Sequence, residues 1–279
     1  MNILNKFENF ELKQEDKISK EDKENCEKIQ AIYEKVLSVY KGWYDIYHQN
    51  LKFNDEHDYY GLKIKDLSIC ERIRDLHNDL IWQIYNYFSS KYNIDLRQRD
   101  IDKSALNYDY QESKINTNPL SYKVYVDDIL KQLGGLNFEN MRIKQLKEKL
   151  KDTCKNRYSN KWNIEIKGNV IKFDNLLSWN KYSWENDYRA SILDGFLFLK
   201  SSLSYFEYGK ELNFVELSHL TRNCYIEWNN IENNIKINSQ KIKSIKLFKN
   251  GRVDVKFSSS ELAREFIENW CGYSLSDVA

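Results

Sequence analysis

Hydrophobic and polar residues alternate most regularly near the C-terminal end of the chain. Apolar residues occupy every second position on either side of segment 249–251, at Ile245, Leu247, Val253, Val255 and Phe257. This period of two predicts a β-hairpin. A three-residue loop places Leu247 opposite Val253 and keeps one face apolar, whereas a two-residue loop would place Leu247 opposite Asp254. We therefore predict the three-residue loop, with Gly251 in the left-handed conformation.

A helix is predicted directly after this hairpin. Ser258 is followed three residues later by Glu261, the pattern of a capping box. Gly272 is a typical helix stop, and the apolar positions before it recur with helical spacing at Leu262, Ala263, Phe266, Ile267 and Trp270. We expect this helix to lie on the apolar face of the hairpin.

Two long helices are predicted in the first part of the chain. After a capping Ser19, the first carries apolar residues at alternating spacings of three and four: Cys26, Ile29, Tyr33, Val36, Tyr40, Trp43 and Tyr47. The second runs from about Asp66 to Phe88, with a stripe of Ile69, Ile73, Leu76, Leu80, Ile84 and Tyr87. Such stripes predict an antiparallel helical hairpin. Residues 1–18 show no pattern and are interpreted as an arm or a loosely docked segment.

Short elements are predicted after Pro119. Residues 122–126 fit either a strand or the start of a helix that continues to Leu133, and Asn137 caps a helix through about Thr153. Alternation on both sides of segment 167–169 predicts a second hairpin. A strongly apolar helix is predicted from Trp184 to about Tyr208. The pattern in residues 211–240 is ambiguous. Within this segment it favours a helix at 214–220 and a strand at 225–228.

These elements predict an α+β fold, with an N-terminal long antiparallel helical hairpin followed by a mixed region of two β-hairpins covered by helices. Segment 93–118 carries charged residues, Asn and Tyr without a clear period. We place a boundary there, which gives a mainly helical region over 1–115 and a mixed α+β region over 116–279 that ends in a β-hairpin and a helix.

The C-terminal residues show a likeness to a known family. The run Phe248-Lys-Asn-Gly-Arg-Val-Asp-Val-Lys-Phe257 and the amphipathic helix after it resemble the end of a phage- and plasmid-borne domain family of unknown function. A looser similarity surrounds Leu176-Leu-Ser-Trp179. The resemblance implies a phage or mobile-element origin and carries no activity with it.

Composition narrows the class of protein. The formal net charge is only +1, which provides no overall field for nucleic acid or an anionic membrane, and 41% hydrophobic residues suffice for a core. No apolar run of about 18 residues and no secretory signal is present, so we expect no membrane association and residence in the cytoplasm, that of the host cell for a phage protein. Five widely spaced cysteines are expected to be reduced thiols.

Catalytic motifs are sparse, and we predict no catalytic residue, metal or cofactor. Glu165 and Lys167 have the Glu-x-Lys form of a metal-dependent nuclease strand and share one face of it. Any amphipathic strand carries polar residues at this spacing, however, so the nuclease is the third of three hypotheses. The cluster Asp55–Asp58 is interpreted as a solvated acidic loop.

A basic segment supports the second hypothesis, a nucleic-acid-binding protein. Its candidate contacts are Arg142, Lys144, Lys147, Lys151, Lys155 and Arg157, with Tyr158 and Trp162 adjacent for stacking on bases. The competing interpretation is a solvated helix face.

The favoured hypothesis is a non-catalytic protein–protein interaction protein that binds, and thereby inhibits, a host defence complex. Aromatic residues on the helical stripes exceed what a two-helix contact covers and are typical of interfaces. The interface candidates are Tyr33, Tyr40, Trp43, Tyr47, Tyr87 and Phe88. We expect a homo-oligomer or an obligate partner at these helices; the alternative is a monomer whose later residues cover the same aromatics.

Overall fold

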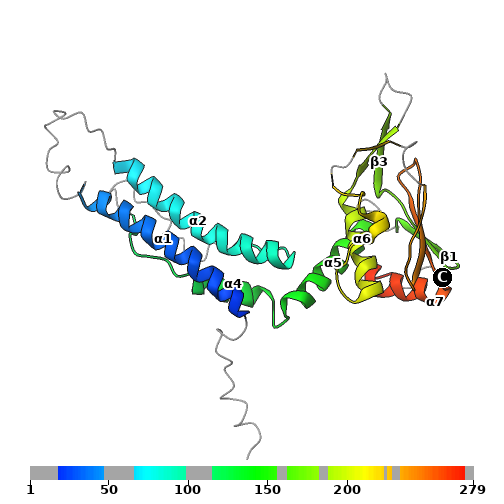
Figure 1. The fold of residues 1–279 in the computed structure, drawn as a ribbon, viewed down its shortest axis with the longest axis horizontal. Coiled ribbons are helices and arrows are strands. Elements are labelled where there is room, and N and C mark those ends of the chain that lie inside the picture. The colour runs from blue at the N-terminus through cyan, green and yellow to red at the C-terminus, as the bar shows by residue number, and fades with distance from the viewer. Residues whose placement is uncertain are drawn as a thin grey trace, which may run out of the picture. The chain divides into compact units, whose positions relative to one another are not determined.

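The structure is a computed structural model that describes residues 18–46, 66–98, 115–155, 162–181, 188–222, 225–227 and 233–273. It has two compact units, Met1–Arg142 and Ile143–Ala279, and the fold class is α+β as predicted (Figure 1). The division falls inside α5 (Phe138–Cys154), whereas the sequence placed it near 115. The observed division lies later than the predicted one because residues between Ile115 and Met141 share the core of the helical hairpin. The predicted arm lies outside the described residues except for Ile18.

The first unit is built on the predicted helical hairpin. Helices α1 (Lys20–Ile46) and α2 (Asp66–Tyr92) pack against each other, and Lys91 near the end of α2 contacts Asp22 at the start of α1. The pair is therefore antiparallel, as predicted. The Ser19 hydroxyl accepts from the Asp22 amide at 3.1 Å, which confirms Ser19 as the cap.

Residues 122–132 form one helix, so the helical alternative for this segment is correct. Helix α4 (Tyr122–Gln132) packs on α2, and Gly134 and Gly135 follow it with positive φ. Asn137 caps α5 through a bond from the Asn140 amide at 2.7 Å, also as predicted.

The buried stripe of α1 differs from the predicted one in its second half. Leu37 is buried and Tyr44 packs on the core, whereas Val36 is half-buried and Trp43 is 54% exposed. The predicted seam repeats every 3.5 residues, but a straight α-helix has 3.6 residues per turn. The core-facing stripe therefore drifts around the helix, and the end of the predicted seam turns towards solvent.

The second unit contains two antiparallel sheets. A five-stranded sheet has the order β1-β2-β8-β7-β6, and a three-stranded sheet has the order β3-β4-β5. The strands are β1 (Ile164–Lys167), β2 (Val170–Phe173), β3 (Leu177–Lys181), β4 (Tyr188–Ile192), β5 (Tyr225–Glu227), β6 (Asn234–Lys236), β7 (Ile242–Leu247) and β8 (Val253–Phe257). Both predicted hairpins, β1–β2 and β7–β8, are present and are joined through the β2–β8 pair.

The C-terminal hairpin has the predicted three-residue loop. Leu247 pairs with Val253 and Ile245 with Val255, and Gly251 has a φ of 84°. The Gly251 carbonyl also accepts the amides of Leu176 and Leu177 at 3.0 and 3.1 Å. The loop thus anchors the chain where β3 begins.

The predicted helix from Trp184 to Tyr208 is wrong in its first half. Residues 188–192 form β4, which pairs with β3 from Leu177↔Ile192 onward, and Trp184 lies outside the described residues. Leu193 is extended, and α6 (Asp194–Tyr208) begins after it. The spacing of Tyr188 and Ile192 fits both a helix and a strand, and the pairing with β3, distant in sequence, decides between them.

The last helix starts one residue later than predicted. Ser258 bonds back to the two residues just before β7, because its amide and hydroxyl donate to the carbonyls of Lys241 and Gln240. Ser259 is the cap and accepts from the Leu262 amide at 3.3 Å. Helix α7 (Ser260–Phe266) continues as a π-helical turn, η7 (Ile267–Cys271), and ends at Gly272 as predicted.

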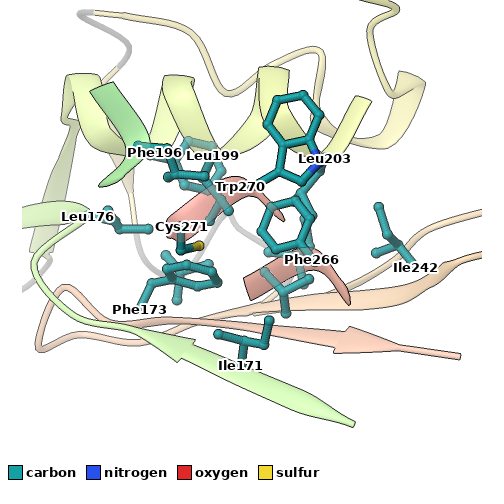
Figure 2. Packing of buried hydrophobic residues seen from close by; sticks show 14 of the residues in the cluster. Ile171, Phe173, Leu176, Phe196, Leu199, Leu203, Ile242, Phe266, Trp270 and Cys271 are labelled. Carbon is teal, nitrogen blue, oxygen red and sulfur yellow. The ribbon is translucent and has the colours of Figure 1, made fainter. Parts of the chain in front are cut away.

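Helices α6 and α7 cover one face of the five-stranded sheet. Figure 2 shows Phe266, Trp270 and Cys271 lying between the side chains of the sheet and those of α6. Each strand sends alternate residues into this core, as the predicted stripes require. Cys154 and Cys271 are free buried thiols within it.

The ambiguous segment 211–240 combines short elements. A 3₁₀ turn, η5 (Val215–Leu217), lies within the predicted helix at 214–220, and β5 matches the predicted extended stretch. Strand β6 was not predicted. Among the described helices, none has both the length and the apolar character that crossing a bilayer requires.

Candidate functional site

Four of the six predicted interface aromatics belong to the core of the first unit or pack against it. Tyr33 and Phe88 are 3% and 0% exposed, and Tyr87 donates a hydrogen bond to Asp22 at 2.9 Å. Tyr40 is half-buried, and Trp43 is exposed. Tyr47 lies outside the described residues. Of the six candidates, Trp43 is therefore the one that the described structure leaves open to a partner.

Tyr33 has a structural role. Its hydroxyl lies 2.9 Å from His77 Nδ1 and accepts the Leu120 amide at 2.8 Å, while His77 Nε2 lies 2.9 Å from the Asn116 carbonyl oxygen. Since that carbonyl can only accept, Nε2 carries the proton and Nδ1 accepts from Tyr33. This series of hydrogen bonds holds residues 116–120 against the helical hairpin.

Replacing Tyr33 with phenylalanine is expected to lower the free energy of unfolding by about 2 kcal/mol, because a buried imidazole nitrogen and a buried amide each lose a partner. Urea denaturation of the full chain measures this change. Tyr40→Phe is the matched control, since no hydrogen bond of its hydroxyl is found within the described residues. An equal loss in both variants would contradict the role of the hydroxyl.

A second apolar stripe lies on the solvent side of α1. Ile32, Val39, Trp43 and Ile46 are 65%, 52%, 54% and 55% exposed, and half-buried Val36 lies between the first two. Their spacings of four and three residues place them on one face of the helix. We call these five residues the α1 stripe. The signal that sequence reasoning missed is the seven-residue interval between Ile32, Val39 and Ile46.

The neighbours of the α1 stripe include a glycine, a lysine and a tyrosine. Gly42 is exposed, and a Cβ added there would meet no atom within 4 Å. Lys35 is exposed one residue before Val36, and the Trp43 ring lies 6.0 Å from the Tyr40 ring in a tilted arrangement. The stripe is therefore an apolar surface that another helix can approach closely.

The predicted basic segment is less uniform than its sequence suggests. Arg142 is 6% exposed, and Arg157 lies outside the described residues. Lys147 lies over the Trp270 ring and Lys155 over the Trp162 ring, each with its nitrogen 5.1 Å from the ring centroid. The aliphatic parts of these two lysine side chains cover apolar surface of the second unit.

The two remaining lysines of this segment, Lys144 and Lys151, are exposed on α5. The side chain of Lys151 also lies beside Gly272, where an added Cβ would stand 3.0 Å from its Cδ. Much of the basic segment is therefore engaged in packing within the second unit, which fits the solvated-face interpretation better than a continuous nucleic-acid patch.

Glu165 and Lys167 share one face of the edge strand β1, as predicted. Glu165 accepts from Lys172 at 2.9 Å, and this hydrogen bond holds the pKa of the carboxyl below its usual value. Within the described part of the chain, no three His, Cys, Asp or Glu side chains come together as a metal site. Glu165 is thus engaged in a cross-strand ion pair with Lys172 rather than with Lys167.

Comparison with known proteins adds no further assignment: no protein-family model, no curated protein and no solved structure matches this chain.

Proposed function

We propose that this chain is a non-catalytic protein–protein interaction protein that assembles through the α1 stripe, with a second copy of the chain as the occupant. The exposed apolar stripe carries the proposal. Over the 14 residue steps from Ile32 to Ile46, α1 rises roughly 21 Å, and four large apolar side chains on this length are more than half exposed. Burying them would remove a row of large apolar side chains from water.

The stripe is self-complementary, which is why a second copy fits it. A two-fold interface uses the same patch on both chains. In an antiparallel pair centred on Val39, Ile32 meets Ile46 of the second copy, because both lie seven residues from the centre. Val36 then faces the small Gly42 of the second copy, and Trp43 faces Lys35, whose ammonium group a tryptophan ring attracts.

The decisive experiment targets the centre of the stripe. The unmodified chain is expected to scatter light at micromolar concentration as a dimer, with twice the 33.6 kDa chain mass. Val39→Glu places two carboxylates at the two-fold axis and should shift the mass to that of the monomer. Trp43→Glu should act in the same direction and leave the fold intact, since Trp43 is exposed.

Two controls make this test specific. Ser38→Glu adds the same charge one residue away, on exposed surface beside the stripe, and should leave the dimer intact. Mixing Val39→Glu with Val39→Lys should restore a dimer, because residue 39 of one copy faces residue 39 of the other. A monomeric unmodified chain, or a mixture that stays monomeric, would refute the antiparallel pairing.

Binding to a host protein complex, the wider prediction from the sequence, is part of the same proposal. In the dimer that binding would use surfaces other than the α1 stripe, which the second copy covers. The Val39→Glu variant therefore separates the two parts, since loss of self-association should leave the surfaces of the second unit unchanged.

A further inference from the structure

The five-stranded sheet has a second face, opposite the one that α6 and α7 cover (Figure 2). Alternate strand residues that do not enter the core lie on it. This open face carries six cationic side chains and two carboxylates: Lys167, Lys172, Lys236, Lys246, Arg252 and Lys256 with Glu165 and Asp254. The whole chain has a net charge of only +1, so positive charge is concentrated here.

One row across this face contains cations without carboxylates. The register places Lys167 opposite Val170, Val170 opposite Lys256, Lys256 opposite Ser244 and Ser244 opposite Lys236. Lysines therefore occupy every second strand, roughly 10 Å apart. All three lysines are exposed, and no ion pair of theirs is found within the described residues. We call Lys167, Lys236 and Lys256 the lysine row.

The neighbouring row shows what a neutralised arrangement looks like on the same sheet. There Glu165, Lys172, Asp254 and Lys246 follow one another with alternating sign across four strands. Glu165 pairs with Lys172 at 2.9 Å, and Asp254 pairs with Arg252 at 3.0 Å. Both carboxylates of the face are thus already occupied, and the lysine row keeps its charge for an external anion.

An aromatic ring lies on the same face beyond the end of β7. Phe248 is half-buried, with the Arg252 guanidinium carbon 4.0 Å and the Lys246 nitrogen 5.1 Å from its ring centroid. Aromatic rings and guanidinium planes are the groups on which unpaired bases stack, while lysines contact the phosphates.

We propose that the lysine row and Phe248 form a binding site for single-stranded nucleic acid. The lysine row would contact phosphates spaced along the strand, and the Phe248–Arg252 stack would receive an unpaired base. A duplex hides its bases from such a flat surface, so the stack favours a single strand. This site is separate from the α1 stripe and from the basic segment of α5, and it does not depend on dimer formation.

Binding of a labelled oligothymidylate to the full chain, titrated over a range of salt concentrations, tests the proposal. Replacing all three lysines of the row with glutamine should lower the affinity about a hundredfold at about 0.1 M salt. The slope of log affinity against log salt should fall in magnitude by about 2, or roughly 0.7 for each lost phosphate contact. Because the three side chains are exposed, the melting temperature should not change.

A charge-matched variant on α5, Lys147→Gln with Lys151→Gln and Lys155→Gln, is the control and should leave the salt slope unchanged. An equal loss in this variant would assign the binding to α5 and overturn the sheet site. No binding by the unmodified chain at low salt, or an unchanged slope after substitution of the lysine row, would also overturn it.

Two further arms separate a nucleic acid from other polyanions. Phe248→Leu should weaken binding about tenfold at high salt, where phosphate contacts are screened and stacking remains. Unlabelled duplex DNA and polyglutamate should compete poorly. Competition by the duplex equal to that by the single strand would remove the stacking role, and equal competition by polyglutamate would identify an acidic protein segment as the ligand instead.

Discussion

Replacing Gly251 with alanine is expected to destabilise the second unit by about 3 kcal/mol or more. Two effects add. The φ of 84° is strained for any residue with a Cβ, and an added Cβ would lie 2.3 Å from the Leu177 carbonyl oxygen, a backbone atom that cannot move aside. The Gly251 carbonyl accepts the Leu176 and Leu177 amides that anchor the start of β3, so the loop and the second sheet should loosen together. Valine at this position should be worse still.

A matched glycine separates the two effects. Gly168, in the loop of the other hairpin, has a φ of 61° and no atom within 4 Å of an added Cβ. Gly168→Ala should therefore cost only about 1 kcal/mol, the conformational part. Urea denaturation, with hydrogen exchange followed in β7 and β8, measures both variants. Equal losses would show that the close approach of Leu177 contributes nothing.

Replacing Asp22 with asparagine is expected to destabilise the first unit by about 3 kcal/mol. The carboxylate is fully buried and accepts hydrogen bonds from Lys91 at 2.8 Å, Tyr92 at 2.7 Å and Tyr87 at 2.9 Å, besides the Ser19 hydroxyl at 2.6 Å. An amide nitrogen in place of one oxygen would face donors, and the ammonium would lose its buried counter-charge. Glu21→Gln is the control, since Glu21 also contacts Lys91 at 2.8 Å but is 79% exposed; it should change stability by no more than about 0.5 kcal/mol.

The same carboxylate predicts an acid transition. Burial alone would raise the pKa of Asp22, but the hydrogen bonds from Lys91, Ser19, Tyr92 and Tyr87 outweigh it and lower the pKa from 3.8 to about 2. A depressed folded-state pKa gives stability that is present above pH 3.8 and lost as the pH falls towards 2. Melting temperatures across this range should show a drop that Asp22→Asn removes. An identical pH profile in both proteins would contradict the assignment.

Local patterns predicted the elements whose partners are close in sequence. The β7–β8 register followed from the apolar faces of two adjacent strands, and the Ser19 and Asn137 caps from side chains that bond within one turn. The predictions that failed concerned residues whose structure is decided by contacts with segments distant in sequence. Residues 188–192 form a strand because they pair with β3, and Ser258 does not cap α7 because it bonds to Lys241, just before β7.

The candidate sites show the same limit. Trp43 was selected as an interface candidate for its bulk, and it is exposed. Tyr33 and Phe88 were selected on the same ground, but residues near Leu120 and Phe138, far along the chain, cover them. The lysine row joins β1, β8 and β6, which are separated by tens of residues. Only the order of strands in the sheet brings these charges together, and one sequence does not reveal that order.

The two edge strands of the five-stranded sheet determine how easily another chain can add to the sheet and aggregate. An open edge with free amides and carbonyls invites another chain to add a strand. Here the edges are β1, with four residues that include Glu165 and Lys167, and β6, with three residues that include Lys236. Short strands provide few ladder bonds, and charged side chains at an edge disfavour the addition of another strand. The sheet is thereby protected against uncontrolled growth into fibres, although one of its faces is open.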